Sequence, residues 1–170
     1  MDDAPDRGES RAPRLEDLVE LCRALNREGA RYVLIGGFAV ILHGFVRATK
    51  DVDFLVDSSE ANIQAVKRAM STLPDNAAAL LADDEIQRYQ VVRVADEIVV
   101  DLLGSACRIN YEEAVAAGLD TFTIQGVPIP VANKELLIRM KDTIRESDAV
   151  DVRFLLMRIE EERGRKKGGR

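Results

Sequence analysis

The sequence predicts a protein of the α/β (α+β) class, in which a β-sheet is packed by helices and two helices close the chain. Segments with apolar residues at helical spacing alternate with short runs rich in β-branched residues. Gly, Pro, Ser or Asn separates most of these segments. The 170 residues are 46% hydrophobic and 32% charged, globular values that suffice for one domain with a largely aliphatic core.

The first predicted elements are a helix and a buried strand. Apolar residues follow the helical period from Leu15 to Leu25, and Gly29 is a plausible stop. Tyr32–Ile35 is a short apolar run of strand-forming residues that ends at Gly36-Gly37. This strand is therefore expected to enter a tight turn.

A short helix, a strand and a longer helix are predicted next. Phe38–His43 is expected to form a short helix that Gly44 closes. Asp51–Asp57 alternates polar and apolar residues, as a strand does. Ser58-Ser59-Glu60 is a helix N-terminal signature and leads into the helix predicted over Ala61–Met70.

The second half of the chain predicts two hairpins and two helices. The hairpins pair Val91–Val94 with Ile98–Leu103, and Thr121–Ile124 with Val127–Ile129, whose prolines favour a sheet edge. A helix is expected over Lys134–Ile144 after an Asn133 cap. The last helix is expected to bury an apolar side formed by Val150, Phe154, Leu155 and Met157.

The two ends of the chain differ in composition from the rest. Met1–Arg14, rich in charge, Pro and Gly, predicts a disordered leader, and the basic, Gly-rich Arg163–Arg170 predicts a disordered tail. A single domain over residues 15–162 remains. The two cysteines, Cys22 and Cys107, lack neighbours at ligand spacing and predict buried free thiols.

Charge and hydropathy exclude some classes of protein. No apolar stretch is long enough to span a bilayer and no signal sequence opens the chain, so a soluble, cytoplasmic protein without a membrane partner is expected. The net charge of -6 argues against a surface that coats nucleic acid, although it leaves a local RNA site open.

The strongest chemical signal is a set of three acidic residues. Asp51 and Asp53 are one residue apart on a predicted strand, so both side chains emerge on the same face. Crowded carboxylates favour a cation, and hard oxygen ligands suit Mg²⁺. Asp101 lies within an apolar strand, where an ionised carboxylate needs a partner. If the two strands pair, the three acids can hold two Mg²⁺ ions.

Gly36-Gly37 lies at a strand-to-helix junction. Glycines there let the backbone approach a triphosphate, and the N-terminus of the following helix would direct N–H groups at it. An isolated Gly-Gly pair more often forms only a tight turn. A phosphate-binding role for this pair is therefore expected only in combination with the three acidic residues.

The pattern of Gly36-Gly37, Asp51-Val52-Asp53 and a later apolar-flanked Asp101 resembles the DNA polymerase β superfamily of nucleotidyltransferases. The string from Gly36 to Asp57 and the closing helices look like the bacterial nucleotidyltransferases related to AbiEii-type toxins, and the resemblance runs from about Tyr32 to Leu156. Ser147 stands where relatives often carry a basic residue, and the chain is short beside the larger toxins, which add a helical domain.

The resemblance implies a mixed-sheet fold and transfer of a nucleoside monophosphate from an NTP to an acceptor hydroxyl, dependent on Mg²⁺ or Mn²⁺. Asp51, Asp53 and Asp101 are then the catalytic metal ligands, and Gly36-Gly37 contacts phosphate. Lys141 matches a position expected to reach the triphosphate.

The acceptor and several nearby residues stay open. RNA, including tRNA, or protein is the expected acceptor, with a toxin-antitoxin or phage-defence role and a cognate antitoxin or helical partner. A small molecule such as an aminoglycoside, or a degenerate fold that only binds a partner, are the alternatives. Arg47 and Thr49 either bind phosphate or close a loop. His43 and Asp57 are expected to be structural. Arg145, Asp148 and Asp151 are expected to form an ion-pair network, to which Lys141 could also belong.

Overall fold

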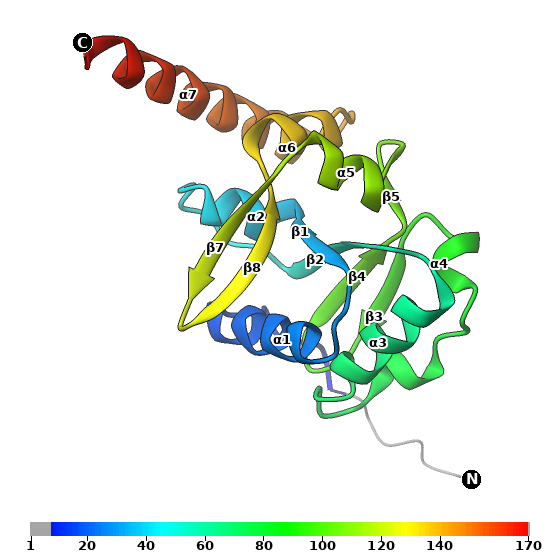
Figure 1. Cartoon of the computed structure of the whole chain (residues 1–170). Helices are drawn as coiled ribbons and strands as arrows, with labels where there is room; N and C mark the ends of the chain where they lie inside the picture. Colours follow the sequence, from blue (N-terminus) through cyan, green and yellow to red (C-terminus); the bar gives the residue numbers. More distant parts are fainter. Residues whose placement is uncertain (1–7, 170) are drawn as a thin grey trace, which may run out of the picture.

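The computed structural model describes residues 8–169, which form a six-stranded mixed sheet covered by helices (Figure 1). The predicted α/β class with C-terminal helices is confirmed. The helices of the described residues are α1 (Leu15–Arg27), α2 (Gly36–Leu42), α3 (Glu60–Met70), α4 (Glu85–Arg88), α5 (Tyr111–Ala117), α6 (Lys134–Met140) and α7 (Glu146–Gly168), with a 3-10 turn η1 (Ala77–Leu80). The strands are β1 (Tyr32–Ile35), β2 (Asp51–Val56), β3 (Val92–Ala95), β4 (Val99–Leu103), β5 (Ser105–Ala106), β6 (Ile109–Asn110), β7 (Leu119–Ile124) and β8 (Val127–Ala132).

The main sheet has the strand order β3-β4-β2-β1-β8-β7, and β5 and β6 form a separate small hairpin. β2 is antiparallel to β1 and parallel to β4, while β1 and β8 are parallel. The predicted hairpins are the antiparallel pairs β3–β4 and β7–β8. The strand that carries Asp101 thus pairs directly with the strand that carries Asp51 and Asp53, as the metal hypothesis requires.

The two faces of the sheet carry different helices, with α1 and α3 on one side and α2, α6 and α7 on the other (Figure 1). Phe54 of β2 faces α1, because its ring packs edge-on against Tyr32, whose hydroxyl donates to Asn26 of α1. Residues alternate along a strand, so Asp51 and Asp53 emerge on the face of α2 and α6. The apolar face builds the core and leaves the opposite face for the acids.

Two helix boundaries differ from the prediction. α2 begins at Gly36 rather than Phe38, so the Gly-Gly pair belongs to its first turn. α6 starts after the Asn133 cap, whose side chain accepts from Leu136 N at 2.8 Å, but it ends at Met140 rather than Ile144. The chain turns at residues 141–145 before α7 begins.

The prolines of the second hairpin do not lie at a sheet edge. They occupy β8, which lies between β1 and β7. The Pro128 carbonyl accepts from Asn26 Nδ2 of α1 at 2.8 Å. The partner of Pro128 in β7 is Thr123, while the β1–β8 pairing is at Leu34↔Val131, three residues further along β8.

The buried side of α7 is more polar than predicted. Val150 and Met157 are exposed, whereas Asp148 and Asp151 are buried together with Leu155. Buried carboxylates require ionic or hydrogen-bonded partners. Their partners lie at the candidate site described below.

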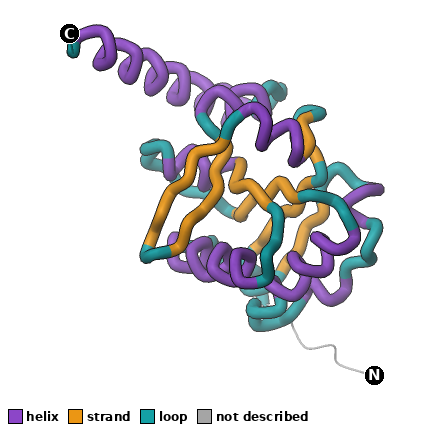
Figure 2. The backbone as a smooth tube through the Cα atoms, viewed as in Figure 1, coloured by secondary structure: helices purple, strands orange, loops and turns teal. Residues whose placement is uncertain are grey.

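The ends are more ordered than predicted within the described residues. Ser10 and Arg11 bond to the β3–β4 turn, through Ser10 Oγ to the Asp96 carbonyl (2.7 Å) and Arg11 N to the Glu97 carbonyl (2.9 Å). α7 continues through Gly168 (Figure 2), in a stretch rich in the helix formers Glu, Arg and Lys. Residues 1–7 of the leader predicted over residues 1–14 lie outside the described residues.

Cys22 is fully buried, as predicted, but Cys107 is only partly buried. Among residues 8–169, no helix combines the length and apolar character that a membrane crossing requires.

Candidate active site

The three predicted acids meet on one face of the sheet. Asp53 and Asp101 are Cα partners in the parallel β2–β4 pair, and Asp51 precedes Asp53 by one pleat. One carboxylate oxygen from each residue can be chosen so that all three lie within 4.8 Å of one another. The strand pairing therefore assembles a set of oxygen ligands of the kind that hard cations prefer.

The crowding changes the acidity of the cluster. Burial, reinforced by the charges of Asp51 and Asp101, raises the pKa of Asp53 to about 7. Burial and the Asp101 charge also raise the pKa of Asp51, against a lowering by Arg93. Both pKa shifts have the sign expected for carboxylates that are buried and lie close to other carboxylates.

Arg93, which the sequence reasoning missed, supplies a cation to this cluster. It lies opposite Asp101 in the antiparallel β3–β4 pair. Its Nε and Nη2 donate to the two oxygens of Asp101 at 2.9 Å each, and Nη2 also lies 3.3 Å from Asp51 Oδ2. The partner that a buried Asp101 needs is thus an arginine in this structure. The register of the predicted hairpin was the signal that could have revealed it.

Close packing explains the Gly-Gly pair. Gly36 has φ +70°, and a Cβ there would lie 2.1 Å from Asp53 Oδ2. A Cβ on Gly37 would lie 2.6 Å from Thr49 Oγ1. The glycines therefore leave room for the Asp53 carboxylate and the Thr49 hydroxyl, a role that the sequence did not reveal.

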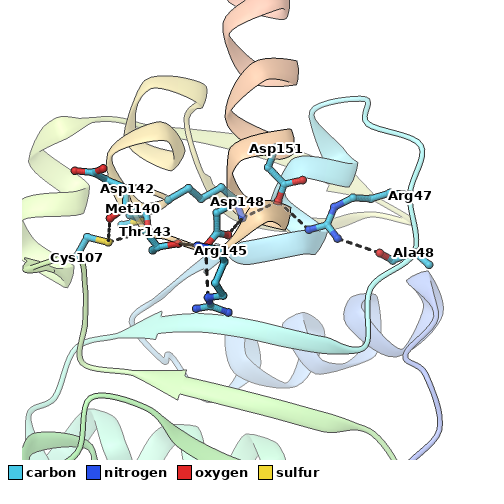
Figure 3. Close-up of polar contacts among 10 residues, drawn as sticks. Arg47, Ala48, Cys107, Met140, Asp142, Thr143, Arg145, Asp148 and Asp151 are labelled. Carbon is cyan, nitrogen blue, oxygen red and sulfur yellow. Dashed lines mark hydrogen bonds and ion pairs between the residues drawn. The ribbon is translucent and has the colours of Figure 1, made fainter.

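A buried ion-pair network centred on two aspartates of α7 holds two cations (Figure 3). Asp151, 1% exposed, contacts Lys141 Nζ at 2.8 Å and Arg47 Nη2 at 2.9 Å. Lys141 is 8% exposed and also lies 3.4 Å from Asp148 Oδ1. α7 thus supplies the counter-charges that fix two basic side chains, one on the loop before β2 and one at the end of α6.

The network extends to the turn between α6 and α7 (Figure 3). Asp148 accepts a hydrogen bond from Thr143 Oγ1 and lies 3.5 Å from the exposed Arg145 Nε. Cys107 Sγ donates to the Met140 carbonyl at 3.1 Å, so the β5–β6 hairpin contacts the end of α6 beside Lys141. The network predicted for Arg145, Asp148 and Asp151 is present, and it also includes Arg47 and Lys141.

These groups line one pocket of about 550 Å³, a size typical of ligand sites. Its lining includes the predicted site residues Gly36, Gly37, Arg47, Thr49, Asp51, Asp53, Asp101 and Lys141, together with Arg93 and Arg145. Carboxylates form one part of the wall, and basic side chains supplied by the pre-β2 loop, α6 and the α6–α7 turn form another. The predicted residues therefore converge on one cavity.

His43 and Asp57 lie outside this pocket. His43 is buried, its Nε2 lies 2.9 Å from the Ala132 carbonyl, and its ring packs against Phe122. Asp57 Oδ1 accepts from Ser59 N at 2.9 Å at the start of α3. Both contacts agree with the structural roles expected of these residues.

No protein-family model matches this chain, and a search of curated proteins found no match either. The geometry of the pocket alone therefore supports a functional interpretation of the site.

Proposed function

We propose that the chain is a nucleotidyltransferase that transfers a nucleoside monophosphate from an NTP to an acceptor hydroxyl, dependent on Mg²⁺. The observation that carries this proposal is the convergence of Asp51, Asp53 and Asp101 in one pocket with the basic residues Arg47 and Lys141. A metal–triphosphate complex needs both oxygen ligands for the metal and cations for the phosphates.

The donor set fits Mg²⁺, or Mn²⁺ in its place. Asp51, Asp53 and Asp101 offer carboxylate oxygens from adjacent strands, and burial together with the charges of Asp51 and Asp101 raises the pKa of Asp53. When bound, the metal supplies neutralisation of phosphate charge and lowers the pKa of the attacking hydroxyl.

Other residues of the pocket are proposed to contact the triphosphate. Lys141 and Arg47, held by Asp151, offer donors to its anionic oxygens. Gly36 and Gly37 begin α2 and leave room for the Asp53 carboxylate and the Thr49 hydroxyl, and Thr49 Oγ1 adds a polar contact in the pocket.

The proposed reaction is an in-line displacement at the α-phosphorus of the NTP. The acceptor oxygen forms a bond to the α-phosphorus, and the bond from that phosphorus to the oxygen leading to the β-phosphate breaks. Pyrophosphate leaves with the electron pair, and the hydroxyl proton passes to a carboxylate of the triad or to water. RNA or protein supplies the hydroxyl in this proposal, and a toxin-like role in a defence system with a cognate antitoxin extends it.

The test incubates the purified chain with each α-³²P-labelled NTP, Mg²⁺ and an acceptor pool of total tRNA, cell protein or aminoglycosides. The proposal is supported if the unaltered protein labels one acceptor pool, if Asp53→Asn loses that labelling and if Asp83→Asn retains it. Asp83 is a matched control because it is an exposed aspartate outside the pocket. Equal labelling by Asp53→Asn and the unaltered protein would exclude these acids as the catalytic set.

A further inference from the structure

We infer that Arg93 and the divalent metal compete for the same place between Asp51 and Asp101. Arg93 is then the counter-ion of the triad in the metal-free protein, and metal loading displaces it. This inference rests on the proposed function, because it concerns the same acidic site.

The position of Arg93 Nη2 carries the argument. This nitrogen lies 2.9 Å from Asp101 Oδ2 and 3.3 Å from Asp51 Oδ2, so it bridges the two carboxylates from different strands. A metal shared by these carboxylates would bind the same oxygens at about 2.0–2.1 Å. Two cations cannot share that space without strong repulsion.

Both oxygens of Asp101 are engaged by the guanidinium. Nε contacts Oδ1 and Nη2 contacts Oδ2, a bidentate arrangement that neutralises a side chain only 7% exposed. Arg93 therefore satisfies the buried acid while the metal is absent. Without Arg93, the three carboxylates would lie close together with less positive charge to offset their mutual repulsion.

Arg93 can leave Asp101 without disturbing the core. Its side chain is 61% exposed and comes from β3, an edge strand of the sheet. It lines both the acidic pocket and a neighbouring groove of about 400 Å³ that includes Leu80, Tyr89 and Val91. The groove offers the released guanidinium a place beside the site.

The test measures the binding of Mg²⁺ by calorimetry and of Mn²⁺ by electron paramagnetic resonance, without nucleotide. Arg93→Gln is expected to bind metal roughly threefold to tenfold more tightly, because the competing charge-assisted pair is gone. Arg88→Gln, an exposed arginine paired with Asp84 outside the pocket, is the matched control and should bind as the unaltered protein does. Asp101→Asn should weaken binding in both backgrounds.

Thermal unfolding supplies a second readout. Arg93→Gln should lower Tm in chelator, and saturating Mg²⁺ should raise its Tm more than that of the unaltered protein. Unchanged metal binding by Arg93→Gln would overturn the competition, and weaker binding would instead make Arg93 a residue that supports the site. If neither protein binds metal, the proposed function itself fails; if both bind equally, only the inference about Arg93 fails.

Discussion

Asp53 of β2 and Asp101 of β4 are Cα partners across a parallel strand pair, so two acids 48 positions apart in the chain become neighbours on one face. Asp51 joins them through the two-residue repeat of the strand. The sheet face, rather than a loop, holds the proposed metal ligands. This placement favours rigid ligand geometry.

Gly36→Ala should impair metal binding as well as stability. Its Cβ would meet Asp53 Oδ2 at 2.1 Å, and Gly36 also has a positive φ. Gly126→Ala is the matched control, since Gly126 has φ +76° but open space around it. Both variants should lose roughly 1 kcal/mol from backbone strain in urea unfolding, and only Gly36→Ala should lose metal affinity in calorimetry. Equal effects on metal affinity would argue against a site at Asp53.

Asp151→Asn should destabilise the fold by about 3 kcal/mol, because Lys141 and Arg47 would lose a buried counter-charge. Nucleotide binding should weaken too, since neither cation would be held against the pocket wall. Urea unfolding and calorimetry with NTP and Mg²⁺ measure the two effects. Glu161→Gln, which alters an exposed ion pair on the same helix, should change stability by less than about 1 kcal/mol. A similar small effect of Asp151→Asn would contradict the ion-pair network.

Asp17→Asn should show how firmly residues 8–14 are attached to the domain. Hydrogen bonds from Arg11 hold the pKa of Asp17 below its usual value, so the folded state favours the charged carboxylate. The stabilisation is therefore present above about pH 4 and is lost as the pH falls through the lowered pKa. Asp17→Asn should cost about 1 kcal/mol at pH 7, and the cost should shrink as the pH falls below about 4 in denaturant titrations. A cost independent of pH would show that the charge is not involved.

Much of the fold was predictable because its patterns are local. The alternation of Asp51, Val52 and Asp53 identifies a strand with an acidic face, and the Asn133 cap identifies the start of α6. The pairing of β2 with β4 was only a condition of the metal hypothesis. The structure confirms that condition.

The remaining features depend on distant contacts. Arg93 reaches Asp101 only through the register of β3 and β4. Asp148 and Asp151 interrupt the apolar side expected of α7, and they are tolerated because Lys141 meets both of them. Hydrophobic periodicity predicts which apolar residues are buried, but it does not identify the polar side chains that find partners across the fold.

The most direct test of the central claim uses the NTP and acceptor identified by the labelling screen. The rate of Mg²⁺-dependent label transfer is measured for the unaltered protein, Asp53→Asn and Asp83→Asn, with folding checked by circular dichroism. Asp53→Asn should reduce the rate about a hundredfold to a thousandfold, as expected when charge stabilisation of the transition state is lost, while Asp83→Asn should leave it unchanged. Transfer by a folded Asp53→Asn at the rate of the unaltered protein would contradict the claim.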